Sequence, residues 1–346
     1  MTALNISVVG AGYWGKKVIR EILSLAKTTG KVNLYSVVDN SPSILEQCRK
    51  EFGPLRYRLN YGDLLSDREC SAVHICSPNP THFEVTSEFL RSKKDVLVEK
   101  PLALRPREAY ELVRLAETNR RVLSTGHIHR FNNGVKELKR AVHSGVLGDI
   151  YYLRLRWTGL LPPQNNRDVI TDLGPHPFDI CNSVLGLWPM KISCRGRGYR
   201  SQASDEVAFI TSEYIDGVFA NIELSWLDHE KRREVTVVGS DAVARLDCLD
   251  QTLVLQRPDR TEPISVVQSN TLGDEILHFA GCVEQNCRSQ AYTNLADGVL
   301  GAEVVRLLEA SKRSVYEERS VQVQHPQRVE ILAGEQTHTG FRKLVD

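Results

Sequence analysis

The sequence predicts an α/β protein in which a doubly wound parallel sheet precedes a second α/β domain with a large, mainly antiparallel open sheet. Apolar runs of strand length alternate with helical patterns over the first third of the chain, and a glycine-rich turn follows the first run. Beyond about residue 126 the pattern changes to a series of strands joined by short turns. Because 346 residues exceed one ordinary core, we divide the chain into residues 1–126, residues 127–315 and a peripheral segment, residues 316–346.

The first domain is predicted from strands that are almost continuously apolar, as in a sheet buried on both faces. Its expected strands are Ile6–Val9, Leu34–Val38, Ala72–Cys76, Val96–Val98 and Val122–Ser124. Its expected helices lie near 14–27, 42–51, 80–92 and 106–119. Strands and helices that alternate at these lengths imply parallel strands with helices on both faces of the sheet.

The second domain is predicted as an antiparallel meander with helices before and after it. Its expected strands are 150–157, 190–199, 205–214, 217–226, 233–238, 242–248 and 252–256. Its expected helices lie near 133–144, 175–185, 273–288 and 298–312. Short turns between several strands favour antiparallel neighbours. The last 30 or so residues are polar and weakly patterned, so we expect them to be peripheral or partly mobile.

Composition excludes several classes of partner. The formal net charge is +1, which provides no global field for nucleic acid or an anionic membrane, and basic pairs such as Arg232-Arg233 are interpreted as solvated faces. No apolar run approaches the ~20 residues of a membrane helix, and the chain begins without a signal-peptide pattern. The eight cysteines form no Cys-x-x-Cys pair. We therefore expect a soluble cytoplasmic protein with reduced cysteines and no metal site.

A glycine-rich turn follows the first expected strand and opens the first expected helix. Its residues are Gly10, Ala11, Gly12, Tyr13, Trp14 and Gly15. Gly10 permits a tight turn, Gly12 lets backbone amides approach a pyrophosphate, and Gly15 allows close packing of helix and strand. The alternative is a glycine-rich turn without a ligand. The strand before it and the helix after it favour a dinucleotide site.

Asp39 ends the second expected strand. A carboxylate at this position can accept hydrogen bonds from the adenosine ribose and would repel a 2′-phosphate. No arginine follows until Arg49. We therefore expect NAD in preference to NADP, although Asp39 could instead be an ordinary turn residue at the end of a strand.

Two further segments carry groups suited to proton transfer. Lys100 follows Glu99 at the end of the fourth expected strand, where ligands of such sheets bind. An amine there can polarise a carbinol oxygen, although Lys-Pro is also a common start of a loop. Asp172 and His176 are four residues apart at a helix start and could meet on one face, but Asp172 could equally be a helix cap.

Together these segments resemble the glucose–fructose oxidoreductase, inositol dehydrogenase and MocA (Gfo/Idh/MocA) family over residues 4–315. The segments in family order are Gly10-Ala11-Gly12-x-x-Gly15, Ser77-Pro78-Asn79-Pro80-Thr81-His82, Glu99-Lys100-Pro101, Gly126-His127-x-x-Arg130-Phe131-Asn132 and Asp172-x-Gly174-x-His176. The resemblance implies a Rossmann domain, and an open sheet that forms homodimers or homotetramers. It implies that Lys100, Asp172 and His176 are catalytic, with a cis peptide at Pro101. It assigns cofactor contacts to Gly10, Gly12, Tyr13, Trp14, Gly15, Asp39, Ser77, Pro78, Asn79, His82, Glu99 and Lys100.

The substrate is expected to be a sugar-like polyol. The expected substrate contacts are Arg130, Asn132, Trp157 and Arg167. Together with Arg154 and Arg156 they give this region an excess of positive charge, which suits a phosphate-bearing sugar. The resemblance favours members that oxidise C3 of a UDP-N-acetylhexosamine. A free cyclitol or aldose is the main alternative, followed by a non-catalytic NAD-binding regulator. A metal-dependent lyase or hydrolase is disfavoured because no cluster has zinc-ligand spacing.

Overall fold

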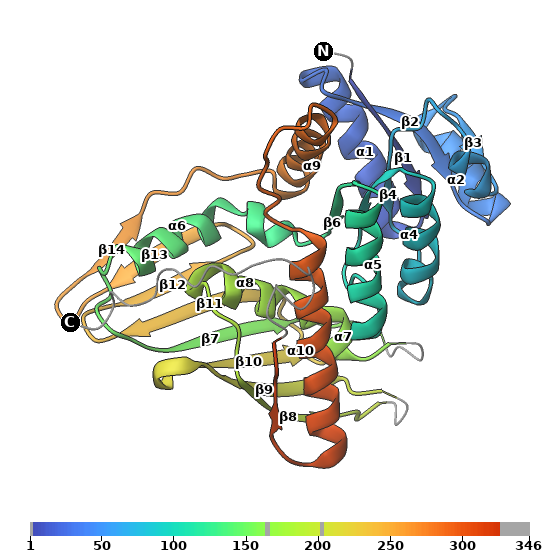
Figure 1. Ribbon diagram of the computed structural model, residues 1–346. Coiled ribbons are helices and arrows are strands. Elements are labelled where there is room, and N and C mark those ends of the chain that lie inside the picture. The colour runs from blue at the N-terminus through green and yellow to red at the C-terminus, as the bar shows by residue number, and fades with distance from the viewer. Residues whose placement is uncertain (1–2, 163–166, 201–203, 326–346) are drawn as a thin grey trace.

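The protein consists of two sheets with helices packed around and between them, as seen in a computed structural model that describes residues 3–162, 167–200 and 204–325 (Figure 1). The first sheet has six strands and the second has nine. The α/β class and the division into a parallel and a mainly antiparallel sheet are confirmed.

The first sheet is parallel in every recorded pair and has the strand order β3-β2-β1-β4-β5-β6. Its strands are β1 (Leu4–Val9), β2 (Val32–Val38), β3 (Tyr57–Arg58), β4 (Ala72–Ile75), β5 (Asp95–Val98) and β6 (Leu123–Thr125). Its helices are α1 (Tyr13–Thr28), α2 (Pro42–Phe52), α3 (Gly62–Leu65), the short η1 (Asn79–Thr81), α4 (His82–Arg91) and α5 (Pro106–Thr118). The strand order reverses between β1 and β4, and this switch point is where doubly wound sheets bind ligands.

The second sheet has the order β14-β13-β12-β11-β7-β10-β9-β8-β15. Its strands are β7 (Ile150–Thr158), β8 (Lys191–Arg197), β9 (Val207–Glu213), β10 (Phe219–Ser225), β11 (Arg232–Gly239), β12 (Val243–Asp247), β13 (Thr252–Gln256), β14 (Thr261–Ile264) and β15 (Val321–Gln322). The expected continuous meander is wrong at the centre, where β7 pairs antiparallel with β11 and parallel with β10. Local turn signals could not reveal this insertion, because β7 precedes its neighbours by more than 60 residues.

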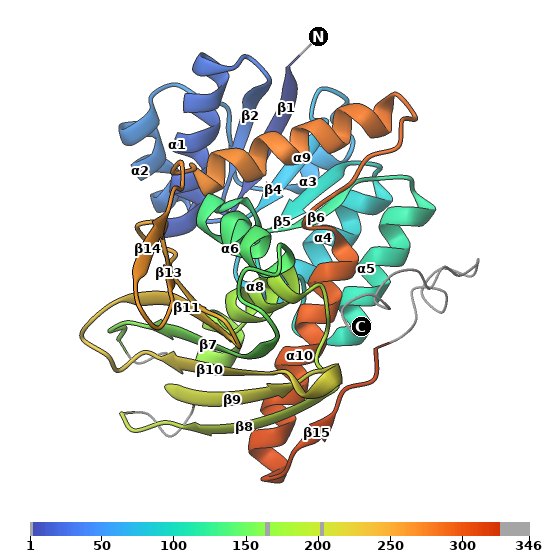
Figure 2. The same ribbon diagram turned by 90° about the vertical axis from the view of Figure 1, so that its left-hand side faces the viewer.

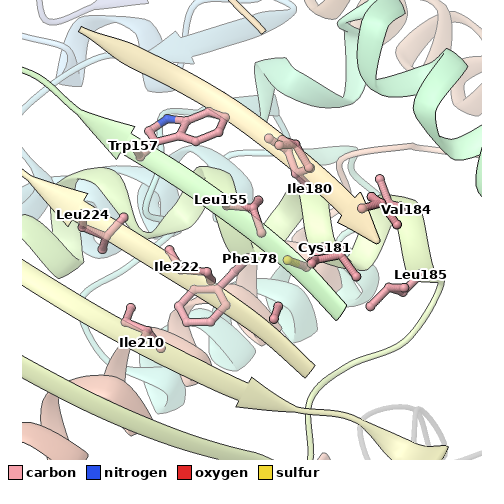
Figure 3. Packing of buried hydrophobic residues seen from close by; sticks show 14 of the residues in the cluster. Leu155, Trp157, Phe178, Ile180, Cys181, Val184, Leu185, Ile210, Ile222 and Leu224 are labelled. Carbon is pink, nitrogen blue, oxygen red and sulfur yellow. The ribbon is translucent and has the colours of Figure 1, made fainter. Parts of the chain in front are cut away.

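Helices cover one side of the second sheet (Figures 1 and 2). They are α6 (Asn133–His143), α7 (Val169–Leu173), α8 (Pro175–Leu185) and α10 (Gly298–Glu317), with the short η2 (Ile128–Phe131) before α6 and η3 (Ile215–Gly217) between β9 and β10. The buried face of β10 presents Ile222 and Leu224 to Phe178 of α8 (Figure 3). The alternation of buried and exposed residues along these strands therefore places the core between sheet and helices.

The last helices tie the two halves together. Helix α9 (Thr271–Cys287) returns to the first half, where Ile276 and Phe279 pack in one cluster with Val8 of β1. Helix α10 contacts both α5 and β8. The segment expected to be peripheral begins with packed structure, because Val321 is buried in the core of the second half. Residues 326–346 lie outside the described residues.

Two expectations from composition can be compared with the structure. All eight cysteines are free thiols, and six of them are buried, as expected for core residues. In the described part of the chain, no helix has the combination of length and apolarity that crossing a membrane requires.

Candidate active site

The glycine turn lies between β1 and α1, and its three glycines meet different demands. Gly10 has a φ of +94°, and an added Cβ would lie 2.6 Å from the backbone nitrogen of Ser77. A Cβ on Gly15 would lie 1.9 Å from the carbonyl oxygen of Gly10. A Cβ on Gly12 would meet nothing within 4 Å. The fold therefore demands the outer two glycines, whereas Gly12 keeps an open space over the helix that a ligand can enter.

The N-terminus of α1 is free to bind an anion. Its N-cap is Gly12, no side chain caps it, and its first turn contains no acidic residue. In contrast, side chains of Ser41, Asn132 and Asp297 cap α2, α6 and α10. The uncapped amides of α1 suit the pyrophosphate of a dinucleotide, which satisfies them and interacts favourably with the helix dipole.

Asp39 lies beside this turn. Its carboxylate accepts hydrogen bonds from the backbone nitrogen of Ala11 at 2.8 Å and of Ser41 at 2.9 Å. These contacts fix the carboxylate at the carboxyl end of β2, next to the space over Gly12. Both oxygens retain a lone pair for the ribose hydroxyls, which fits the expected recognition of NAD.

Trp14 and Tyr13 extend from the start of α1 in different ways. The indole Nε1 of Trp14 donates to Glu99 Oε1 at 2.5 Å, which links α1 to the end of β5. Tyr13 is 79% exposed, so its ring can contact a ligand. Burial raises the pKa of Glu99, but hydrogen bonds from His74 and Trp14 and the charge of Lys100 outweigh this effect and lower the pKa. The Glu99 side chain is thus a buried, ionised anchor.

His74, Cys76 and Glu99 form a group whose ligand atoms lie within 4.8 Å of one another. His74 Nε2 lies 3.2 Å from Glu99 Oε1, so these two groups already satisfy each other. Burial raises the pKa of the Cys76 thiol well above its ordinary value, which keeps the weaker, protonated ligand form. The group is therefore better suited to hold Glu99 in place than to bind a metal.

The loop after β4 contains four expected cofactor contacts. Ser77, Pro78 and Asn79 lie at the carboxyl end of the strand, and Ser77 Oγ is 2.7 Å from Thr81 Oγ1. His82 is completely buried, with Nδ1 2.7 Å from the Pro101 carbonyl oxygen and Nε2 2.9 Å from the Ser77 carbonyl oxygen. A direct cofactor contact by His82 does not fit this placement. The ring instead ties the loop after β4 to the loop after β5.

The side chain of Lys100 reaches from the first half of the molecule to a residue of the second half. The Lys100-Pro101 peptide is cis, as the resemblance implied. Its Nζ donates to the backbone carbonyl oxygen of Asp172 at 2.6 Å and lies 3.4 Å from Asp172 Oδ1. Arg167 Nη1 lies 3.3 Å from the same carboxylate oxygen. The amine and the carboxylate that the sequence placed 72 residues apart are thus in contact.

His176 is the second residue of α8, close to the same amine. Its ring stacks edge-on against His129 with centroids 4.9 Å apart. Burial lowers the pKa of His176 well below its ordinary value, and the charge of Lys100 lowers it further. The imidazole is therefore neutral near pH 7 and can accept a proton.

The expected Asp172–His176 couple is replaced by a different pairing. Asp172 lies in α7 and His176 in α8, and the carboxylate of Asp172 is held by Lys100 and Arg167. No hydrogen bond joins Asp172 to His176 among the described contacts. The spacing of Asp172 and His176 indicated that both could face one site, but it could not reveal which groups the carboxylate would pair with.

Three of the four expected substrate contacts serve the fold. Arg130 donates to Asp179 and Asn182 of α8. Asn132 is buried and caps α6, where its Oδ1 accepts from the backbone nitrogen of Val135 at 3.1 Å. Trp157 is fully buried at the end of β7. Only Arg167 lies in the site with an exposed guanidinium, beside residues 163–166, which are outside the described residues.

The other two arginines of the expected basic region, Arg154 and Arg156, point away from the site. Arg156 is paired with Glu223 and Glu234 on the other face of the sheet. Arg154 lines a small hollow with the same three residues. Strand alternation separates these arginines from Trp157, which belongs to the helix-covered face.

Two residues near the site were missed. His129 contacts both Trp157 and His176. Arg233, interpreted from its basic pair as a solvated residue, places its guanidinium 5.6 Å from the centre of the Trp157 ring. The available signal was the alternation of β11, which separates Arg232 from Arg233, but only the pairing with β7 reveals which of them faces inward.

Comparisons with known proteins agree with this architecture. A family model described as an oxidoreductase family with an NAD-binding Rossmann fold matches residues 4–127. A Gfo/Idh/MocA C-terminal domain model matches residues 135–245, and the two matches together span more than half of the chain. Relatives include a UDP-N-acetylglucosamine 3-dehydrogenase of Acidithiobacillus ferrooxidans, 25% identical over 88% of this chain and 95% of the relative. A myo-inositol 2-dehydrogenase of Thermotoga maritima is 23% identical over 93% of this chain and 99% of the relative.

Solved structures share the fold over nearly the whole chain. That of the UDP-N-acetylglucosamine 3-dehydrogenase from A. ferrooxidans has a TM-score of 0.80 at 24% identity, covering 92% of this chain and 99% of the other. An inositol dehydrogenase homolog from Azotobacter vinelandii, complexed with NAD+, has a TM-score of 0.83 at 18% identity, covering 93% and 98%. The chain therefore belongs to the Gfo/Idh/MocA oxidoreductase family and carries its NAD-binding Rossmann fold.

Proposed function

We propose that the protein transfers a hydride between NAD and a secondary carbinol of a sugar. The observation that carries this proposal is the contact of Lys100 Nζ with Asp172, next to the neutral imidazole of His176. An amine from the nucleotide-binding half and an imidazole from the sheet half thus meet at the carboxyl end of β5. A regulator that only senses NAD needs neither group at this place.

The side chains can divide the proton chemistry among themselves. Bound NAD supplies the hydride acceptor at its nicotinamide. Lys100 can donate a hydrogen bond to the carbinol oxygen, and Asp172 fixes the direction of the amine. His176 is neutral and can take the hydroxyl proton as the carbon is oxidised. We assign the proton to this set of three, because closely spaced titrating groups share their protonation steps.

For the substrate, we propose a nucleotide-linked sugar oxidised at C3, such as a UDP-N-acetylhexosamine. Support comes from the relative named UDP-N-acetylglucosamine 3-dehydrogenase and from the surplus of cations around Asp172. The relative named myo-inositol 2-dehydrogenase supports a free cyclitol or aldose as the second candidate. The carboxylate of Asp39 supports NAD over NADP.

The substrate proposal is tested by incubating the protein with NAD or NADP and a panel of UDP-sugars, free sugars and inositols. The absorbance of the reduced cofactor reports hydride transfer. We expect turnover with NAD and a UDP-N-acetylhexosamine. Turnover restricted to inositols or free aldoses would replace the substrate assignment, and a preference for NADP would contradict the role given to Asp39.

Lys100→Ala tests the proposed catalytic group. We expect kcat to fall by about 10²–10⁴, the range for losing a positioned acid or base, while NAD binding measured by calorimetry stays unchanged. Lys139→Ala on the exposed side of α6 is the control and should leave kcat as it is. Unchanged turnover in Lys100→Ala would remove the amine from the mechanism.

We also propose that the chain assembles as a homodimer or homotetramer through the second sheet. The described helices lie on one side of this sheet only, and the other side exposes Phe209 and Phe219. Tyr152 stacks on Phe219 with ring centroids 5.5 Å apart. Light scattering of the purified protein measures the number of subunits.

A further inference from the structure

One cation in the wall of the site forms no ion pair at contact distance with a carboxylate of the described residues. Arg233 Nη1 donates to the carbonyl oxygens of Thr158 at 2.7 Å and Arg232 at 2.6 Å. Both bonds use the same nitrogen. Nε and Nη2 have no hydrogen-bond partner in the described part of the chain. Neither atom is among the described polar atoms that are buried from solvent without a partner, so both remain accessible. Three N–H donors of this guanidinium therefore remain for a ligand.

The strand register directs Arg233 toward the site. Arg233 of β11 is paired with Trp157 of β7, and it shares the inward face of β11 with the buried Val235 and Val237. Arg232 and Glu234 alternate with it and form an ion pair on the other face. The guanidinium lies over the Trp157 ring, which in turn lies 6.3 Å from the ring of His176. One indole thus separates Arg233 from the proposed proton acceptor.

The charge of Arg233 is only partly balanced within the site, because Asp172 acts on it but already pairs with two other cations. Burial lowers the pKa of Arg233 to about 10 against the opposing effect of the Asp172 charge, and the guanidinium still carries its charge near pH 7. Lys100 and Arg167 share the carboxylate of Asp172, and Glu99 is engaged with Trp14 and His74. Holding an unpaired cation in a partly desolvated place is costly unless an anion binds there.

We propose that Arg233 is the anion-recognition residue of this site and binds a carboxylate or phosphate that the sugar carries close to its reacting carbinol. The proposal rests on the proposed function and specifies its substrate class as an acidic sugar. Guanidinium groups are planar and bind both anions through paired hydrogen bonds, and the Trp157 ring beneath limits the orientations that this guanidinium can take. A sugar carboxylate or the phosphate at the anomeric carbon would each satisfy Arg233.

Binding to the NAD-loaded protein tests this without requiring turnover. Calorimetry compares glucose, glucuronate and glucose 1-phosphate in wild type, Arg233→Gln and the control Arg232→Gln. We expect wild type to bind at least one anionic sugar tenfold or more tightly than glucose. Arg233→Gln should abolish that preference, whereas Arg232→Gln should keep it because Arg232 faces the other side of the sheet. Whichever anionic sugar binds more tightly identifies the source of the anion.

Two results would overturn the proposal: wild type without a preference for anionic sugars, or Arg233→Gln with the preference intact. If Arg233→Gln does not fold, Arg233→Lys replaces it. Lysine keeps the charge but loses the planar fork, so the preference should fall several-fold, and an unchanged preference would contradict the assignment. Failure of hydride transfer in the substrate panel, with Arg233-dependent binding preserved, would refute the proposed function alone.

Discussion

The two halves of this chain place their functional groups by different means. In the first half, a short motif determines both the local backbone and the site: Gly10 and Gly15 shape the turn that leaves α1 uncapped. In the second half, the face of a strand and the identity of its neighbour decide whether an arginine serves the site. Arg156 and Arg233 lie on adjacent strands, and one is paired on the open face while the other lies over Trp157.

The difference teaches that a motif carries functional information only where the geometry is local. Glycine spacing requires no knowledge of the rest of the fold, because the turn and the helix follow directly in the chain. Arginines on strands require the register, because a shift of one residue exchanges the two faces. Substitutions can therefore sharpen the comparison by separating what a residue does for the fold from what it does for a ligand.

The largest effect is expected from the glycine turn. Gly15→Ala places a Cβ 1.9 Å from the Gly10 carbonyl oxygen, so the helix must move away from the strand. We expect a large loss of stability, visible as a lower urea midpoint or as insoluble protein. Gly12→Ala meets nothing within 4 Å and should fold as wild type does, but its methyl group would occupy the space over the amides of α1.

The two glycine variants thus separate fold from ligand. For Gly12→Ala we expect an unchanged urea midpoint and NAD binding weakened tenfold or more, measured by calorimetry. If Gly12→Ala binds NAD normally, the pyrophosphate does not lie over this turn. If Gly15→Ala is as stable as wild type, the close packing of α1 on β1 is not needed.

The sequence predicted the strand-helix order of the first half and the meeting of Lys100 with the segment around Asp172. It did not reveal the partner of that carboxylate, because only the packed structure shows that Asp172 pairs with Lys100 and Arg167. It misplaced Arg130 and Asn132, since an ion pair with Asp179 and a helix cap have the same residue types as a substrate site. Arg233 was missed because its strand partner, β7, lies far away in the chain.

A medium effect is expected from His82, which supports the first half of the site without reaching it. His82→Phe keeps an aromatic ring but removes the ring N–H, which donates to the carbonyl oxygen of Ser77 or of Pro101 depending on the tautomer. The loops after β4 and β5 should separate slightly. We expect kcat/KM to fall by about tenfold or more, because misplacement by a fraction of an ångström is costly in catalysis.

A matched control separates this positioning role from a loss of stability. His143 Nε2 lies 3.0 Å from the Val184 carbonyl oxygen in the second half, away from the site. His143→Phe should cost about 1 kcal/mol of stability with kcat/KM unchanged. Partial rescue of kcat by His82→Gln, which restores a donor, would support positioning. Equal kinetic losses in His82→Phe and His143→Phe would contradict it.

The smallest effect is expected in the pH dependence of stability, where the two halves oppose each other. Burial lowers the pKa of His129 from its ordinary value of 6.5 to about 3. Between these pH values His129 binds a proton in the unfolded chain but not in the folded chain, so stability is lost as the pH falls. Burial raises the pKa of Asp95 from 3.8 to about 6, so the folded chain binds the extra proton there, and stability is gained as the pH falls.

Removing each group should therefore change the slope of stability against pH in opposite directions. Between pH 6 and pH 4.5, His129→Phe should make the loss of stability shallower and Asp95→Asn should make it steeper. Each change is at most about 1.4 kcal/mol per pH unit, the value for one proton. Urea unfolding at pH 7.5, 6.0, 5.25 and 4.5 measures the slopes. Because both variants are compared with the same wild type, slopes that change in the same direction would show that burial in the two halves does not act on these groups with opposite sign.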